Sequence, residues 1–122
     1  PERGAGTRLE IRVGDGAANP YLIIASILAA GLDGLTRKLP VPASADGWAY
    51  QNEAAEVLPA SLATALDALD ASTVLREALG EAFIDVFTVL KRDEVQRYEA
   101  EVGDPTTRDV TQWELDEYLE DY

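Results

Sequence analysis

Three charged residues near the start of the chain, Arg8, Glu10 and Arg12, are the best candidates for chemistry. If their segment is an extended strand, side chains two residues apart lie on one face at a spacing of about 6.6 Å. Two guanidinium groups would then flank one carboxylate. Guanidinium groups bind phosphate and carboxylate oxygens through forked hydrogen bonds, and a carboxylate can be a ligand of Mg²⁺. The pattern suits a phosphorylated substrate that carries a carboxylate.

The same spacing also fits a solvated strand face that binds no ligand. The charges would then pair with a neighbouring strand, and exposed pairs of this kind contribute little energy. The spacing taken alone favours this interpretation, so a binding site needs support from the rest of the chain.

The elements that must position these charges begin with residues 7–13, the one convincing strand, where apolar and polar residues alternate with period two. A short turn follows. Asn19 is then expected to cap a helix with Pro20 at its first position. This helix is apolar nearly all round, so we expect it to be central to a core and to end near Gly31 or Gly34.

Helices dominate the remainder. Residues 40–59 contain several prolines and no sustained periodicity, which predicts a long loop. Ser61 and Ser72 are expected to cap two short helices, and Gly80 to separate the second of these from a longer helix. At helical spacing, the residues expected to face inward on the longer helix are Phe83, Ile84, Phe87, Leu90 and Tyr98. The chain is thus predicted to be α+β, with one strand followed by a mostly helical segment.

A capping box at Thr111 and Glu114 predicts a final helix that carries Trp113, Tyr118 and Leu119 beside several acids. Exposed aromatic side chains need a surface to cover them. Two interpretations stay open: the helix folds back on its own chain, or it docks on another subunit.

Composition narrows the possible functions. The formal net charge of −13 arises entirely after residue 52, because residues 1–52 hold five acids and five bases. Nucleic acids and anionic membrane surfaces bind clustered Lys and Arg, so neither is an expected partner.

The chain has no Cys and no His, which excludes a disulfide framework, a thiolate zinc site and an imidazole base. The apolar stretch at residues 20–32 is too short to span a bilayer, no secretion signal is visible, and we expect the cytoplasm.

Three strings in one order and spacing resemble the glutamine synthetase family: RLEIR at residues 8–12, ANPYL at 18–22 and AAGLDG at 29–34. The similarity extends through LPASL at residues 58–62 to the last helices. On this resemblance, residues 1–122 are identified as the carboxy-terminal segment of a glutamine synthetase-type catalytic domain, an incomplete domain of a bacterial, glutamine synthetase-like ligase.

The resemblance implies roles for the charged triplet. Arg8 would contact the nucleotide phosphates, Glu10 would ligate Mg²⁺ or Mn²⁺, and Arg12 would contact the amino-acid substrate; no catalytic residue is assigned. The implied enzyme is an ATP-dependent carbon–nitrogen ligase that converts glutamate and ammonia to glutamine through a γ-glutamyl phosphate. The segment alone is expected to be inactive, because the family's other metal carboxylates and its metal-binding His are absent.

Alternatives remain at this stage. Gly14-Asp15 stands where many family members have Pro-Asp, which resembles ligases that join glutamate to a polyamine or an aromatic amine. A rival of another class is a non-catalytic helical assembly module.

The resemblance also implies a homo-oligomer of stacked rings, with the final helix reaching into the facing ring. Tyr50 lies in a region comparable to the nucleotidylated loop of some bacterial members, although packing near Trp48 is the favoured interpretation.

Overall fold

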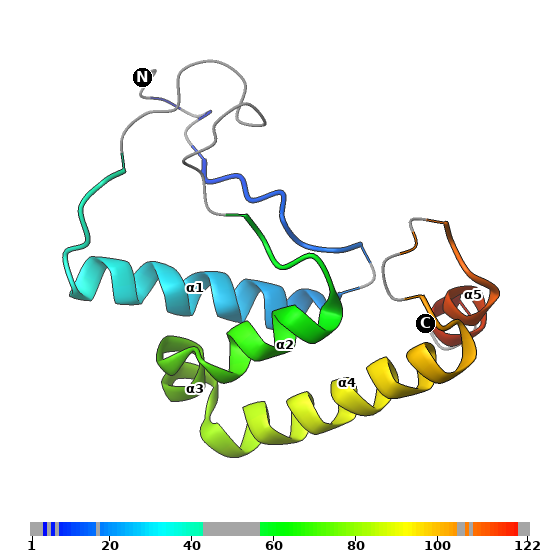
Figure 1. Ribbon diagram of the computed structural model, residues 1–122. Coiled ribbons are helices and arrows are strands. Elements are labelled where there is room, and N and C mark those ends of the chain that lie inside the picture. Colours follow the sequence, from blue (N-terminus) through cyan, green and yellow to red (C-terminus); the bar gives the residue numbers. More distant parts are fainter. Residues whose placement is uncertain are drawn as a thin grey trace.

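The computed structural model describes residues 4, 6, 8–16, 18–42, 57–104, 107 and 109–119. Most of the predicted loop at 40–59, including Tyr50, lies outside these residues. The described chain forms five α-helices: α1 (Pro20–Thr36), α2 (Leu62–Asp70), α3 (Thr73–Leu79), α4 (Glu81–Glu101) and α5 (Gln112–Leu119). α2 and α3 lie between α1 and α4, with α1 packed on α3, and α5 sits at the carboxy-terminal end of α4 (Figure 1).

The predicted α+β fold is wrong. Residues 8–13 have no regular secondary structure, and no strand occurs anywhere in the part of the chain that the structure describes. Alternation of apolar and charged residues favours an extended backbone, but a strand also needs a neighbouring strand to pair its N–H and C=O groups. No described segment takes that position, so Leu9 and Val13 stay largely exposed.

The start of α1 is confirmed. Asn19 caps it, because its side-chain oxygen accepts hydrogen bonds from the backbone N–H groups of Tyr21 at 3.0 Å and Leu22 at 3.3 Å, and Pro20 is the first helical residue. The helix does not end at Gly31 or Gly34 and continues to Thr36. A glycine inside a helix costs only about 1 kcal/mol, which neighbouring leucines offset.

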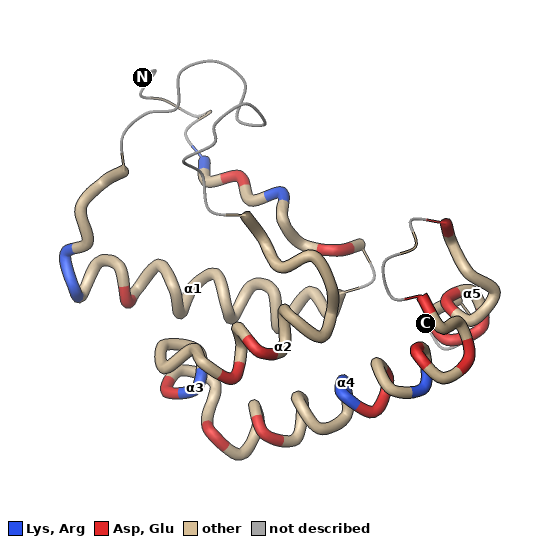
Figure 2. Tube along the Cα trace, in the orientation of Figure 1, with Lys and Arg blue, Asp and Glu red and all other residues tan. Residues whose placement is uncertain are grey.

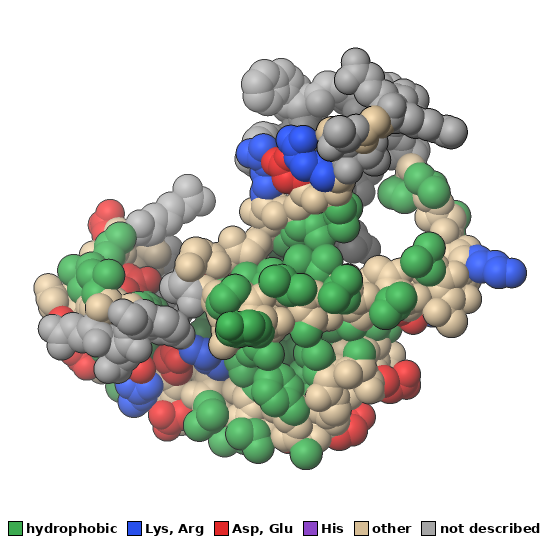
Figure 3. Space-filling view, turned by 180° about the vertical axis from the view of Figure 1, so that it is seen from behind, with side chains coloured by type: hydrophobic (Ala, Val, Ile, Leu, Met, Phe, Trp, Pro, Cys, Tyr) green, Lys and Arg blue, Asp and Glu red, His purple; other side chains and the backbone are tan. Residues whose placement is uncertain are grey.

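The prediction that α1 is central to a core is also wrong, since none of its residues is fully buried. α1 packs on α3 along one side, and its other apolar side chains face outward; the space-filling view shows apolar side chains gathered over the middle of the molecule (Figure 3). The large exposed side chains of α1 are Tyr21, Ile24, Leu28, Leu32 and Leu35. A helix that is apolar all round needs neighbours on every side, and the described chain supplies them on one.

The next two helices begin as predicted. Ser61 accepts a hydrogen bond from the backbone N–H of Thr64 at 3.2 Å, and Thr64 Oγ1 accepts one from the N–H of Ser61, which closes a capping box. Ser72 caps α3 through the N–H of Leu75. Gly80 separates α3 from α4 with φ +95°, a backbone conformation that favours glycine.

The small core lies where α2 packs on α4. Leu66 on α2 is 2% exposed and Ile84 on α4 is 1% exposed. Arg92 bridges the two helices by donating to Asp67 and Asp70, at 2.8 Å each. α4 was expected to turn Phe83 and Leu90 inward, but both are exposed, and the helix instead buries Ile84, Thr88 and Glu94. The predicted helical period is confirmed, but the buried face of α4 is the one turned toward α2 and α5, not the one that carries Phe83 and Leu90.

The last helix folds back on α4. Its capping box is confirmed, with the N–H of Glu114 donating to Thr111 Oγ1 at 3.2 Å. Trp113 is buried and its ring stands perpendicular to that of Tyr98 on α4, at 5.2 Å between centroids. The Tyr118 hydroxyl donates a hydrogen bond to the α4 side chain Glu94.

An ion pair reinforces this docking. Arg97 donates from its two terminal nitrogens to both carboxylate oxygens of Glu117, at 2.9 and 2.7 Å. Of the two interpretations of the final helix, the structure therefore shows the one in which it folds back on its own chain. No helix within the described ranges combines the length and apolar character that crossing a bilayer needs.

The core generates the first prediction. Leu66→Ala should lower the free energy of unfolding by about 3 kcal/mol, because it leaves a cavity in the only part of the described chain where two large side chains are fully buried. Leu90→Ala is the matched control: Leu90 is 63% exposed, and the same chemical change should cost less than about 1 kcal/mol. Urea unfolding followed by circular dichroism measures both. Equal losses would contradict this account of the core.

The second prediction concerns acid. Hydrogen bonds from Arg97 lower the pKa of the Glu117 carboxyl below its ordinary 4.5. A carboxyl whose pKa is lowered in the folded state stabilises that state above its ordinary pKa, and the contribution disappears as pH falls through the lowered value. In a chain whose Trp48 is replaced by Phe, Trp113 emission should therefore stay blue-shifted from pH 7 to about 4.5 and shift to the red below it.

Glu117→Gln removes the titrating group and should show partly red-shifted emission already at pH 7, with a smaller response to acid. Asp116→Asn is the control on the same helix, because among the described residues the Asp116 carboxylate accepts its hydrogen bond from Gln112 of α5 itself. It should behave as the parent chain does. Identical pH profiles for all three proteins would show that the pair with Arg97 does not hold α5.

Candidate functional site

The structure brings the three predicted site residues into direct contact. Arg8 donates from Nε and Nη2 to Glu10 Oε2 at 3.4 and 3.3 Å. Arg12 donates from Nε to the other oxygen, Oε1, at 2.6 Å. One carboxylate is thus held between two guanidinium groups, visible as a row of positive, negative and positive charge along the segment before α1 (Figures 2 and 3).

This triplet is open to solvent. The side chains are 72% exposed for Arg8, 43% for Glu10 and 85% for Arg12. Water and salt screen such pairs, which therefore contribute little to folding. The charges do not pair with a neighbouring strand, as the alternative interpretation required, but with each other. Since little energy holds them together, an anionic or cationic ligand can replace either partner.

A close contact positions the segment against α1. Gly14 lies so near Ile23 that a Cβ added to the glycine would come within 3.1 Å of the Ile23 Cδ1 atom. A turn follows, closed by a hydrogen bond from the N–H of Ala18 to the carbonyl oxygen of Asp15 at 3.2 Å. The Asn19 cap then starts α1. The charged triplet is therefore attached to the amino-terminal end of α1 through tight packing at Gly14.

The expected metal site would need more ligands than the triplet supplies. Glu10 supplies a hard oxygen ligand of the kind that Mg²⁺ and Mn²⁺ accept, but Mg²⁺ requires near-octahedral coordination. No group of three or more acidic side chains that could hold a metal ion occurs among the residues that the structure describes. The donor at Glu10 fits the expected cation, and the other ligands would have to come from groups beyond the described residues.

Sequence analysis missed one feature of interest. A cavity lies between α2, α4 and α5, lined by aromatic and acidic side chains. Its residues come from segments far apart in sequence, so no local pattern marks it. The one available signal was the aromatic character of Tyr98, Trp113 and Tyr118, which we assigned to packing or assembly.

Comparison with known proteins now adds to this geometry. Residues 1–118 match the family described as "Glutamine synthetase, catalytic domain". The glutamine synthetase of Pyrococcus abyssi is 40% identical over 127 residues, covering 95% of this chain and 29% of the relative. Those of Thermus thermophilus and Staphylococcus aureus are 41% and 38% identical, each covering 98% of this chain and 27% of the relative. No solved structure matches the chain.

The chain therefore belongs to the glutamine synthetase family. It spans less than a third of the length of the curated relatives it matches.

Proposed function

We propose that this chain is the carboxy-terminal segment of a glutamine synthetase-type catalytic domain and supplies part of the active site of an ATP-dependent ligase. That ligase joins glutamate and ammonia to form glutamine through a γ-glutamyl phosphate. The observation that carries the proposal is the Glu10 carboxylate between two exposed guanidinium groups, within a segment that matches the family.

Each member of the triplet has a proposed role. Arg8 binds the nucleotide phosphates, Glu10 is one ligand of a divalent cation, Mg²⁺ or Mn²⁺, and Arg12 binds the carboxylate of glutamate. A bound cation would neutralise phosphate charge during phosphoryl transfer, and fixed guanidinium groups do the same from their own positions. When Glu10 turns from the arginines to a cation, both guanidinium groups become available to anionic oxygens. The three side chains can thus exchange their mutual ion pairs for contacts with the cation and with anionic oxygens.

The alternatives have less support. Gly14 was taken as a sign of another amine substrate, but its 3.1 Å approach to Ile23 provides a packing reason for glycine at this position. A non-catalytic assembly module would bind a partner through the acidic helices and leave the triplet a structural role only, whereas several acids of these helices already pair within the chain, among them Asp67 and Asp70 with Arg92. Ammonia and glutamate are therefore the proposed substrates.

The third prediction tests Glu10 in a chimera, in which residues 1–122 replace the matching segment of the Thermus thermophilus glutamine synthetase. Glu10→Gln should lower glutamine synthesis at limiting Mg²⁺ by about tenfold or more, because loss of even an outer-shell partner costs about that much in metal affinity. Saturating Mg²⁺ should restore part of the activity.

Glu77→Gln on α3 is the matched control, because Glu77 is exposed. Its Mg²⁺ dependence should equal that of the unsubstituted chimera, and the 122-residue chain alone should form no glutamine. An unchanged Mg²⁺ dependence in Glu10→Gln would remove Glu10 from the metal site.

The fourth prediction concerns Arg12 in the same chimera. Arg12→Lys keeps the positive charge but loses the forked donors, so the KM for glutamate should rise by about tenfold while the KM for ATP changes little. Arg37→Lys at the end of α1 is the control, because Arg37 is exposed and its ion pair within the described ranges is with Asp33 of the same helix. Steady-state kinetics with each substrate varied in turn measure the effect. A glutamate KM equal to that of the control would argue that Arg12 is a solvated surface charge.

A further inference from the structure

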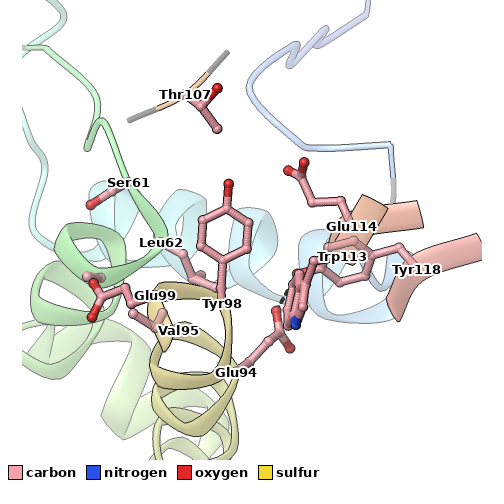
Figure 4. A pocket seen from close by; sticks show the side chains of 11 residues that line it. Ser61, Leu62, Glu94, Val95, Tyr98, Glu99, Thr107, Trp113, Glu114 and Tyr118 are labelled. Atoms are coloured by element: carbon pink, nitrogen blue, oxygen red, sulfur yellow. Dashed lines mark hydrogen bonds between the residues drawn. The ribbon is translucent and has the colours of Figure 1, made fainter. Parts of the chain in front are cut away.

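A cavity of about 240 Å³ lies between the start of α2, the last turns of α4 and the helix α5 (Figure 4). Three aromatic rings and three carboxylates line it, from Tyr98, Trp113, Tyr118, Glu94, Glu99 and Glu114. No Lys or Arg is among its described lining residues. The described lining therefore combines aromatic faces with three carboxylates, of which Glu94 pairs with Lys91 behind the wall.

Two of the aromatic rings that line the cavity already lie close to side-chain cations. The Lys91 ammonium lies 5.9 Å from the centre of the Tyr118 ring, and the Arg97 guanidinium lies 5.6 Å from that of Trp113. Within about 6 Å the negative face of an aromatic ring attracts positive charge. Tyr98 stands between the two sides of the cavity with its hydroxyl directed into the open space (Figure 4).

The cavity has a built acidic wall. The Glu94 side chain is only 10% exposed, and it is fixed by hydrogen bonds from the Tyr118 hydroxyl and, at 2.6 Å, from Lys91 Nζ. Glu99 and Leu62 lie on the side opposite Trp113 (Figure 4). Carboxylates thus surround the space from several directions.

These acids do not converge as metal ligands do, since no described group of three could hold a metal ion. Apolar side chains from Leu62 and Val95 complete the wall. Carboxylates, aromatic faces and an aliphatic patch together fit a positively charged head with a short hydrocarbon tail. A bare metal ion would leave the aliphatic and aromatic surface without a partner.

We propose that this cavity binds a small primary alkylammonium ion, with the ammonium group toward the Tyr98 ring and the carboxylates and the alkyl chain against Leu62 and Val95. The site is separate from the charged triplet and stands or falls independently of the proposed ligase function. Its test therefore uses the 122-residue chain alone and measures binding only.

The probe is n-butylammonium chloride, added at constant ionic strength to a chain in which Trp48 is replaced by Phe. Constant ionic strength keeps screening of the −13 charge unchanged during the titration. Trp113 emission should change with a saturable dependence on n-butylammonium. 1-Butanol has the same tail without the charge, and ammonium has the charge without the tail; each should bind at least about fivefold more weakly. Equal responses to n-butylammonium and 1-butanol, or to n-butylammonium and ammonium, would overturn the proposal.

Two pairs of variants locate the site. Glu99→Gln should weaken n-butylammonium binding about threefold, whereas Glu101→Gln, which removes an exposed acid of the same helix outside the cavity, should not. Tyr98→Leu should weaken binding about fivefold relative to Tyr21→Leu on α1. Because Tyr98 packs on Trp113, Tyr98→Leu is accepted as a test only if its circular dichroism matches that of the parent.

Methyl NMR provides a readout that does not depend on the Tyr98 variant. The methyl groups of Leu62 and Val95 should shift on titration with n-butylammonium, and those of Leu28 on α1 should not. Shifts spread evenly over the chain, or equal affinities of Glu99→Gln and Glu101→Gln, would show a general attraction of cations to an acidic protein and would refute the site.

Discussion

Burial of Leu66 and Ile84, where α2 packs on α4, is the interaction on which the rest of the described structure depends. It fixes α4 on α2, and α4 in turn contacts α3 and carries the partners of α5. Arg92 reaches back from it to α2, and Tyr98 and Arg97 receive α5. Because only a few side chains are fully buried, charged bridges between helices surround a very small apolar centre. Most of the net negative charge lies on this helical part, as the charge distribution along the chain shows (Figure 2).

The exposed apolar surface of α1 and the proposed metal site at Glu10 are both incomplete in the described chain. Tyr21, Leu28 and Leu35 project from a helix that has a partner on one side only. Glu10 is a single carboxylate, whereas a divalent cation such as Mg²⁺ requires several ligands. Both features need groups that the described chain lacks. They agree with a family whose curated members are more than three times as long as this chain.

The charged triplet and the cavity differ in how firmly their charged side chains are held. In the triplet, opposite charges neutralise each other in water, so their mutual attraction is weak and their partners are exchangeable. In the cavity, Glu94 is nearly buried and held by two donors, so its position is fixed before any ligand arrives. Burial of the Tyr118 hydroxyl, next to the Glu94 carboxylate, raises the pKa of that hydroxyl and keeps it a hydrogen-bond donor. The weakly held charges of the triplet suit a reaction in which charge is redistributed during turnover. The fixed carboxylate in the cavity suits the binding of one kind of ligand.

The sequence alone determined whatever depends on a few consecutive residues. The caps at Asn19, Ser61 and Ser72, the break at Gly80 and the capping box at Thr111 all formed as predicted, because their hydrogen bonds and backbone angles are satisfied within one helical turn. The contact of Arg8 and Arg12 with Glu10 is local as well, since each partner lies two residues away, although the spacing was interpreted as that of a strand. Family membership was also readable from the strings around these residues.

Only the tertiary structure decided which surfaces are covered. Residues 8–13 carry the alternation of a strand, yet they form none, because pairing requires a second segment that the pattern cannot supply. α1 has the composition of a buried helix and stays exposed for the same reason. The face of α4 that holds Ile84, Thr88 and Glu94 was selected by the approach of α2 and α5, and that approach also created the cavity around Tyr98. Burial is a property of two surfaces meeting, and the sequence of one segment specifies only one of them.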